Sequence, residues 1–334
     1  MLRDKSVLIT GGTGSFGKAF TRILLKNHNV KRVIIYSRDE FKQDIMKKDF
    51  TNEFPNEASK LRFFIGDVRD KDRLYRAFKG VDYVIHAAAM KQVPACEYNP
   101  FEAIKTNING AQNIVDAALD CSVEKVIALS TDKAVNPINL YGGTKLVSDK
   151  LFISANAYSG DDGTVFSVVR YGNVSGSRGS VIPFFRTLLE KGEKTLPITD
   201  ERMTRFWMTL DDAVNLVLLA LKETNGGETY VYKNPSYKIT DIAEAINPNG
   251  DIKVVGIREG EKLHEVMITA DDSRCTYDYG DYYIIYPNYE WWSKDKYFKT
   301  GGKLISDGWE YNSGTNNVWL NIDTIREKLQ KLGL

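Results

Sequence analysis

The sequence has few of the residues from which metal sites and disulfide frameworks are built. Its three cysteines, Cys96, Cys121 and Cys275, are far apart and odd in number. They form no Cys-x-x-Cys pair and no disulfide framework, and the three histidines lack the spacing of metal ligands. We therefore predict no metal site, structural roles for the histidines, and a reducing, cytoplasmic setting.

An excess of charge and a long apolar run are also missing. With 45 Lys and Arg against 44 Asp and Glu, the formal net charge is +1, which argues against nucleic acid or an anionic membrane as a partner. No stretch approaches the roughly 18 apolar residues of a membrane span, and the run from Val7 to Ile9 is too short for a signal peptide. We expect a soluble protein that holds any anionic ligand through local groups.

The first half of the chain alternates β-rich runs with helical patterns. This alternation predicts an α/β fold with a doubly wound parallel sheet of the Rossmann type. Because 334 residues exceed what one core usually serves, we expect a dinucleotide-binding domain over residues 1–176, with a returning segment near 206–234. Residues 177–334 are expected to form mainly a smaller α/β substrate lobe and an aromatic tail. The expected strands are 6–10, 32–36, 62–65, 83–86, 125–129 and 166–170.

A glycine-rich turn follows the first expected strand. Gly11, Gly14 and Gly17 precede a helical pattern, where glycine permits a tight turn, close approach of backbone N–H groups to a pyrophosphate, and close helix packing. An ordinary glycine-rich turn is the alternative, and the strand-turn-helix context argues against it. The other residues expected along the dinucleotide are Thr13, Ser15, Phe16, Ser37, Arg38, Asp39, Lys42, Asp67, Val68, Ala87, Ala88 and Ala89.

The end of the second strand bears on which dinucleotide is bound. An acidic residue there binds the adenosine ribose hydroxyls of NAD, whereas arginine accommodates the 2′-phosphate of NADP. Arg38 precedes Asp39 and Lys42 follows, so the pattern is mixed. We favour NADP as the cofactor, with NAD or a solvated basic turn as alternatives.

Tyr141 and Lys145 form a Tyr-x-x-x-Lys pattern at the start of an expected helix, which puts both side chains on one face. A nearby ammonium and a positive nicotinamide would lower the pKa of the phenol, so that Tyr141 could act as a base for a substrate hydroxyl. An exposed helix pair is the alternative. Ser130 and Thr131, at the end of the preceding strand, offer hydroxyls to the same proton network and favour the catalytic interpretation.

These residues resemble those of extended short-chain dehydrogenases that act on nucleotide sugars. More closely, the chain is similar to the UDP-N-acetylglucosamine 4,6-dehydratase (5-inverting) family, of the pseudaminic-acid-pathway type, from about residue 5 to residue 270. In two places it departs from the family, with Gln92 for an expected histidine and Gly143 for an expected alanine. The similar stretches are ALSTDK at 128–133, NPINLYG at 136–142, RYGNV at 170–174, MTRF at 203–206 and GEKLHE at 260–265.

The resemblance implies a homo-oligomeric, NADP-dependent lyase acting on UDP-N-acetylglucosamine. Asp132 and Lys133 carry this implication, because removing water across C5 and C6 needs a base and an acid. We expect Tyr141 to take the C4 hydroxyl proton, Lys133 the C5 proton, and Asp132 to protonate the departing C6 hydroxyl. With hydride returned to C6, the product is UDP-2-acetamido-2,6-dideoxy-β-L-arabino-hexos-4-ulose. Desolvation beside Lys91 or the oxidised nicotinamide is expected to leave Lys133 partly neutral.

The resemblance also implies that further residues bind the substrate. Arg205 and Arg258 suit a diphosphate through forked hydrogen bonds, Asn173 the sugar or phosphate, and Glu261 the ribose hydroxyls. A structural salt bridge is the alternative for each. The full set expected to bind substrate is Lys91, Lys133, Asn173, Arg205, Arg258 and Glu261.

Three competing functions stay open at this point. The nearest is the same dehydration with the C5 configuration retained, for which glutamate is expected at the position of Lys133. A UDP-sugar 4-epimerase is next, and it would not need Asp132 and Lys133. A non-catalytic dinucleotide sensor belongs to a different class, and the intact set of Tyr141, Lys145, Asp132 and Lys133 argues against it.

Overall fold

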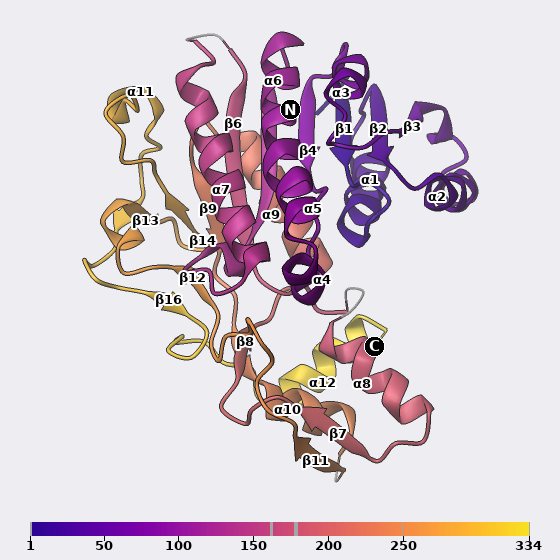
Figure 1. Cartoon of the computed structure of the whole chain (residues 1–334), viewed down its shortest axis with the longest axis vertical. Helices are drawn as coiled ribbons and strands as arrows, with labels where there is room; N and C mark the ends of the chain where they lie inside the picture. Colours follow the sequence, from indigo (N-terminus) through magenta and orange to yellow (C-terminus); the bar gives the residue numbers. More distant parts are fainter. Residues whose placement is uncertain (1, 161–162, 177–179, 249, 334) are drawn as a thin grey trace.

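The computed structural model describes residues 2–160, 163–176, 180–248 and 250–333, and its largest element is a ten-stranded sheet (Figure 1). The strand order is β15-β13-β14-β9-β6-β5-β4-β1-β2-β3, and the strands from β3 to β6 are all parallel. This confirms the predicted doubly wound α/β fold. The six parallel strands are β1 (Ser6–Thr10), β2 (Arg32–Ser37), β3 (Leu61–Ile65), β4 (Tyr83–His86), β5 (Lys125–Thr131) and β6 (Val165–Tyr171).

Helices cover both faces of this sheet because its parallel strands are apolar on both sides. In β1, Val7 and Ile9 pack into one core with Phe20, whereas Leu8 packs into the opposite core with Phe152. The first core is covered by α1 (Ser15–Asn27), α2 (Glu40–Glu53) and α9 (Leu210–Glu223), and the second by α3 (Lys71–Phe78), α6 (Gly110–Asp120) and α7 (Leu140–Ser154).

The later part of the chain returns to the sheet twice. After α9, β9 (Thr229–Tyr232) pairs in parallel with β6. Residues 276–304, which the sequence suggested belong to the lobe and tail, then add β14 (Tyr282–Ile285), β13 (Thr276–Asp278) and β15 (Lys303–Leu304) as antiparallel strands. Tyr282, Tyr286 and Trp292 are buried in the same core as α9, so these aromatic side chains pack inside the chain.

A smaller unit with its own core lies at the carboxyl ends of the parallel strands (Figure 1). Here α8 (Val181–Glu190) and α10 (Ile239–Ile246) pack with α12 (Ile322–Lys331) against the parallel pair of β7 (Thr195–Ile198) and β11 (Asp251–Val254). Among the described residues, no helix is both long and apolar enough to cross a membrane. The remaining elements are α4 (Val93–Tyr98), α5 (Pro100–Ile104), β8 (Thr204–Phe206), β10 (Ser236–Lys238), β12 (Val266–Ile268), α11 (Lys294–Tyr297), β16 (Tyr311–Asn312), one π-helical turn, η2 (Lys105–Asn109), and four 3₁₀ turns, η1 (Ala58–Lys60), η3 (Asp132–Ala134), η4 (Ala155–Ala157) and η5 (Asp272–Cys275).

Candidate active site

A cavity of about 1150 Å³ lies where the parallel strands end and the smaller unit begins. Ligands of open α/β sheets bind at this edge, because the turns after successive strands meet there. Every residue expected along the dinucleotide lines the cavity, and so do Thr131, Lys133, Tyr141 and Lys145. Asp132 is the one predicted catalytic residue that does not line it.

The glycine-rich turn has the geometry for which its glycines were singled out. Gly11 has a φ of +65°, a conformation that strains other residues. A Cβ on Gly17 would lie 2.3 Å from the carbonyl oxygen of Gly12, so glycine is needed where α1 packs on the turn. Helix α1 has neither a side-chain cap nor an acidic residue in its first turn, so its backbone N–H groups suit an anion.

The acidic residue after β2 is occupied within its own helix. The carboxylate of Asp39 accepts the backbone N–H of Lys42 at 2.9 Å, which caps α2, and pairs with the ammonium of Lys42 at 2.6 Å. These hydrogen bonds hold the pKa of Asp39 below its usual value. The side chain of Arg38 is 66% exposed, lines the cavity, and lies 3.8 Å from Asp67. The mixed pattern in the sequence thus separates into a capping carboxylate and an exposed guanidinium.

Tyr141 and Lys145 lie in the first turns of α7, as their spacing predicts. The chain's own groups do not lower the pKa of Tyr141. Burial raises it to about 12, and the nearby ammonium of Lys133 and a hydrogen bond with Thr131 offset only part of this effect. Burial also lowers the pKa of Lys145. In the chain alone, burial therefore outweighs the ammonium, and the nicotinamide is the other cation expected to lower the pKa of Tyr141.

Asp132 and Lys133 follow the carboxyl end of β5 in the short turn η3. The side chain of Lys133 is 22% exposed and its Nζ donates to Asp132 Oδ1 at 3.1 Å and to Asn173 Oδ1 at 3.1 Å. Asp132 is 1% exposed, lies behind Lys133, and also accepts the hydroxyl of Thr131 at 2.8 Å. The hydroxyl of Thr131 therefore lies between this carboxylate and Tyr141.

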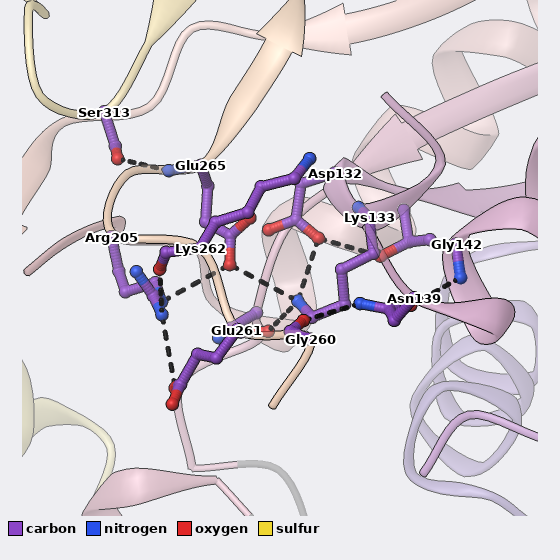
Figure 2. A network of polar contacts seen from close by, with 12 residues as sticks. Asp132, Lys133, Asn139, Gly142, Arg205, Gly260, Glu261, Lys262, Glu265 and Ser313 are labelled. Atoms are coloured by element: carbon purple, nitrogen blue, oxygen red, sulfur yellow. Dashed lines mark hydrogen bonds and ion pairs between the residues drawn. The ribbon is translucent and has the colours of Figure 1, made fainter. Parts of the chain in front are cut away.

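In the chain alone, the charge state of Lys133 depends on burial and on two nearby carboxylates. Burial does lower the pKa of Lys133, but the carboxylates of Asp132 and Glu265 outweigh it and raise the pKa above its usual value. Glu265 Oε1 lies 3.6 Å from Lys133 Nζ (Figure 2). The resting side chain is thus an ammonium between two carboxyl groups. Asp132 is adjacent to Lys133 in the sequence, whereas Glu265 comes from a distant part of the chain.

Helix α7 can approach Lys133 only because its third residue is glycine. A Cβ on Gly142 would lie 2.0 Å from the carbonyl oxygen of Lys133, whereas a Cβ on Gly143 would meet nothing within 4 Å. Asn139 caps the helix by accepting the N–H of Gly142 at 2.8 Å, and it donates to the carbonyl of Gly260 at 2.7 Å (Figure 2). The start of the helix that carries Tyr141 is therefore tied to the loop that precedes Glu265.

The residues expected to bind substrate fall into two groups. Lys91, Asn173 and Arg258 are exposed and line the cavity. Arg205 also lines it, but its guanidinium donates to the carbonyls of residues 204, 262 and 263, and pairs with Glu261 at 3.3 Å. Glu261 Oε2 is buried without a hydrogen-bond partner within the described part of the chain. Arg258 is thus available to a diphosphate, while Arg205 holds the loop from 261 to 265.

The sequence analysis left Glu265 and several residues that line the cavity without a role. Glu265 lies in the stretch GEKLHE at 260–265, which resembles the family, but no role was assigned to it, although its charge was a usable signal. The apolar side chains of the smaller unit gave no signal, because no motif separates a cavity wall from a core. Those that line the cavity include Ile182, Phe184, Phe185, Met203, Tyr237 and Ile239.

Comparison with known proteins places the chain in a family. A family model described as "Polysaccharide biosynthesis protein" matches residues 7–287. This chain belongs to that family. The chain is also 55% identical over 324 residues to the UDP-N-acetylglucosamine 4,6-dehydratase (inverting) of Campylobacter jejuni, with 96% of this chain and 95% of that protein covered. The resemblance drawn from the five stretches is thereby confirmed.

Other members and a solved structure extend the comparison. The UDP-glucose 4-epimerase of Rickettsia bellii is 44% identical over 339 residues, with 99% of this chain and 97% of that protein covered. The crystal structure of Pen from Bacillus thuringiensis superposes with a TM-score of 0.89 at 36% identity, covering 100% of this chain and 99% of that one. Relatives of this chain thus carry the names of two different activities.

Proposed function

We propose that the protein is a UDP-N-acetylglucosamine 4,6-dehydratase that inverts C5. The observation that carries this proposal is the hydrogen-bonded pair of Asp132 and Lys133 beside Tyr141 at the end of β5. An oxidation at C4 needs a base such as Tyr141 alone, whereas removing water across C5 and C6 needs a second acid and base. The 55% identical relative with the name of this activity supports the same conclusion.

We infer that the cofactor is NADP. The residues fit a nicotinamide dinucleotide, since the N-terminus of α1 suits its pyrophosphate and Arg38 is exposed in the cavity. Asp39 is engaged as a helix cap and with Lys42, so it is a poor acceptor for ribose hydroxyls, which favours a 2′-phosphate on Arg38 and Lys42. A bound NADP would supply the hydride acceptor for C4 of the sugar and the hydride donor for C6.

Tyr141 takes the C4 hydroxyl proton in this proposal, and the positive nicotinamide supplies the lowering of its pKa that the chain lacks. The hydroxyl of Thr131 links Tyr141 to Asp132, which gives that proton a path to the buried carboxylate. Thr131 lines the cavity, so the same hydroxyl can deliver the proton from Asp132 to the departing C6 oxygen. Lys133, which lines the cavity and whose Nζ donates to Asn173, is the base for C5.

We also infer a division of the chain and its setting. Residues 1–176 with 206–234 hold the dinucleotide, and the smaller unit within 177–334 mainly holds the nucleotide sugar, with Arg258 on the diphosphate and Glu261 on the ribose. Tyr98 and Phe101, which are 88% and 73% exposed, supply apolar surface for a homo-oligomer. The small net charge is consistent with a cytoplasmic enzyme that binds neither nucleic acid nor membrane.

A UDP-sugar 4-epimerase is the second candidate, and the names of the Rickettsia relatives favour it. Incubation with UDP-N-acetylglucosamine in heavy water, followed by NMR of the product, separates the candidates. A 6-deoxy-4-keto sugar of L-arabino configuration with deuterium at C5 is expected. A D-xylo product would refute inversion but keep dehydration, a C4 epimer would establish the epimerase, and an unchanged sugar with retained dinucleotide would point to a sensor.

A further inference from the structure

Glu265, the residue before β12, is buried against the acid–base pair (Figure 2). Its Oε1 lies 3.6 Å from Lys133 Nζ and 3.4 Å from Arg205 Nε. Its Oε2 has no hydrogen-bond partner among the residues that the structure describes. The backbone N–H of Glu265 donates to the hydroxyl of Ser313 at 2.9 Å, and its carbonyl accepts the N–H of Ser313 at 2.8 Å. The carboxyl group is therefore fixed in place by the backbone with half of its acceptor capacity unused.

The proposed dehydration requires Lys133 to lose a proton, and Glu265 lies close enough to accept it. Lys133 is an ammonium in the resting protein, and it must lose a proton before its lone pair can accept one from C5. In the proposed mechanism, Asp132 already holds the proton that it donates to the C6 oxygen, so it cannot also accept the proton of Lys133. In the described part of the chain, Glu265 is the other carboxyl group within 4.0 Å of Lys133 Nζ.

The charges around Glu265 allow it to accept that proton. Burial and the carboxylate of Asp132 raise its pKa, while the surrounding cations lower it, and the raising effects prevail. An unpartnered, buried carboxylate oxygen favours the neutral acid for the same reason, because desolvation disfavours the charged form. The titratable groups that face Glu265 are Asp132, Lys133, Arg205, Lys262 and Tyr237.

We propose that Glu265 is a positioning residue that receives one proton from Lys133 before the C5–H bond breaks, an inference that rests on the proposed function. In this step an N–H bond at Nζ breaks and an O–H bond forms on Glu265, so the pair changes from two charged groups to two neutral ones. The lone pair left on Nζ then takes the C5 proton. The electron pair of the C5–H bond forms the C5=C6 bond as the C6 hydroxyl departs with the proton held by Asp132.

Glu265→Gln tests this role, because an amide keeps the shape of the side chain but carries no charge and cannot take up the proton. In single turnovers followed by absorbance, C4 oxidation should remain within about threefold of native, while elimination falls by at least about 10²-fold, the low end of acid–base contributions. Reduced cofactor should accumulate. Elimination in the variant should also rise roughly tenfold per pH unit, because Lys133 must then lose its proton to solvent, whereas the native rate stays flat. Glu228→Gln, at a buried carboxyl group held by Thr224 and two backbone N–H groups, is the matched control and should leave both steps unchanged.

Native elimination with a flat pH profile in Glu265→Gln would overturn the proposal, and so would an equal loss of both steps. Should the glutamine variant fail to fold, Glu265→Asp decides, since it retains a carboxyl group one methylene farther from Nζ. Slower elimination with unchanged C4 oxidation is then expected, and native rates for both would overturn the proposal. If the native protein itself forms no dehydrated sugar, the proposed function fails, an outcome that is distinct from either result for Glu265.

Discussion

Replacing glycine by alanine should have opposite effects on stability at two adjacent positions in α7. A Cβ at Gly142 would lie 2.0 Å from the carbonyl oxygen of Lys133 and 3.1 Å from Pro137, so Gly142→Ala must push the helix away from the turn η3. Overpacking of this kind costs about 1–3 kcal/mol, and we expect the upper end because the obstacle is backbone. At Gly143 the added methyl meets nothing within 4 Å, and alanine in a helix gains up to about 1 kcal/mol over glycine.

The two variants can be compared by chemical denaturation, where the native midpoint should lie between them. The expected difference in the free energy of unfolding between the variants is about 2–4 kcal/mol. Gly142→Ala should also slow elimination, since the displaced backbone carries Lys133, whereas Gly143→Ala should keep native activity. A shift of both midpoints in the same direction would refute the reasoning from Cβ geometry, and so would a fully active Gly142→Ala variant.

Four further outcomes are expected. Lys133→Met should permit hydride transfer from C4 but stall before loss of water, so reduced cofactor and a 4-keto sugar accumulate in absorbance and NMR, and native turnover would reject Lys133 as the base. Arg258→Ala should weaken UDP binding in calorimetry by about 1.5–3 kcal/mol and leave the unfolding midpoint unchanged. Arg205→Ala should weaken UDP binding and also lower the unfolding midpoint, because its guanidinium holds the loop from 261 to 265. Arg38→Ala should reduce the preference for NADP on reconstitution, as judged by mass spectrometry of the released dinucleotide, and retention of NAD alone by the native protein would contradict the argument. Burial and then the charge of Lys145 lower the pKa of His86 from 6.5 to about 3, so its contribution to stability is present above pH 6.5 and lost as the pH falls towards 3, by up to about 1.4 kcal/mol per pH unit. Unfolding of His86→Gln should depend less steeply on pH over that window, and an unchanged dependence would exclude His86 as the cause.

Short-range sequence patterns were enough to predict the parallel strands and to select residues that line one cavity. The parallel strands are recognisable as apolar runs, and the turn from Gly11 to Gly17 has the glycine spacing of an anion site. Both patterns can be identified from the sequence because each involves residues only a few positions apart. The spacing of Tyr141 and Lys145 likewise set them on one face of a helix. The strands of residues 276–304 escaped prediction, since Tyr282 and Tyr286 look the same in a surface tail as in the sheet that they join.

The sequence by itself therefore determined which groups the candidate site contains: the glycine-rich turn after β1, Tyr141 with Lys145, and the adjacent Asp132 and Lys133. The tertiary structure decided the pKa values of these groups and which of them line the cavity. Burial outweighed the cation beside Tyr141, and Asp132 came to lie behind Lys133. The carboxylates of Asp132 and Glu265 together outweighed burial and raised the pKa of Lys133. The physical reason is that desolvation and Coulomb interactions depend on distances in space, and these are set by segments far apart in the chain.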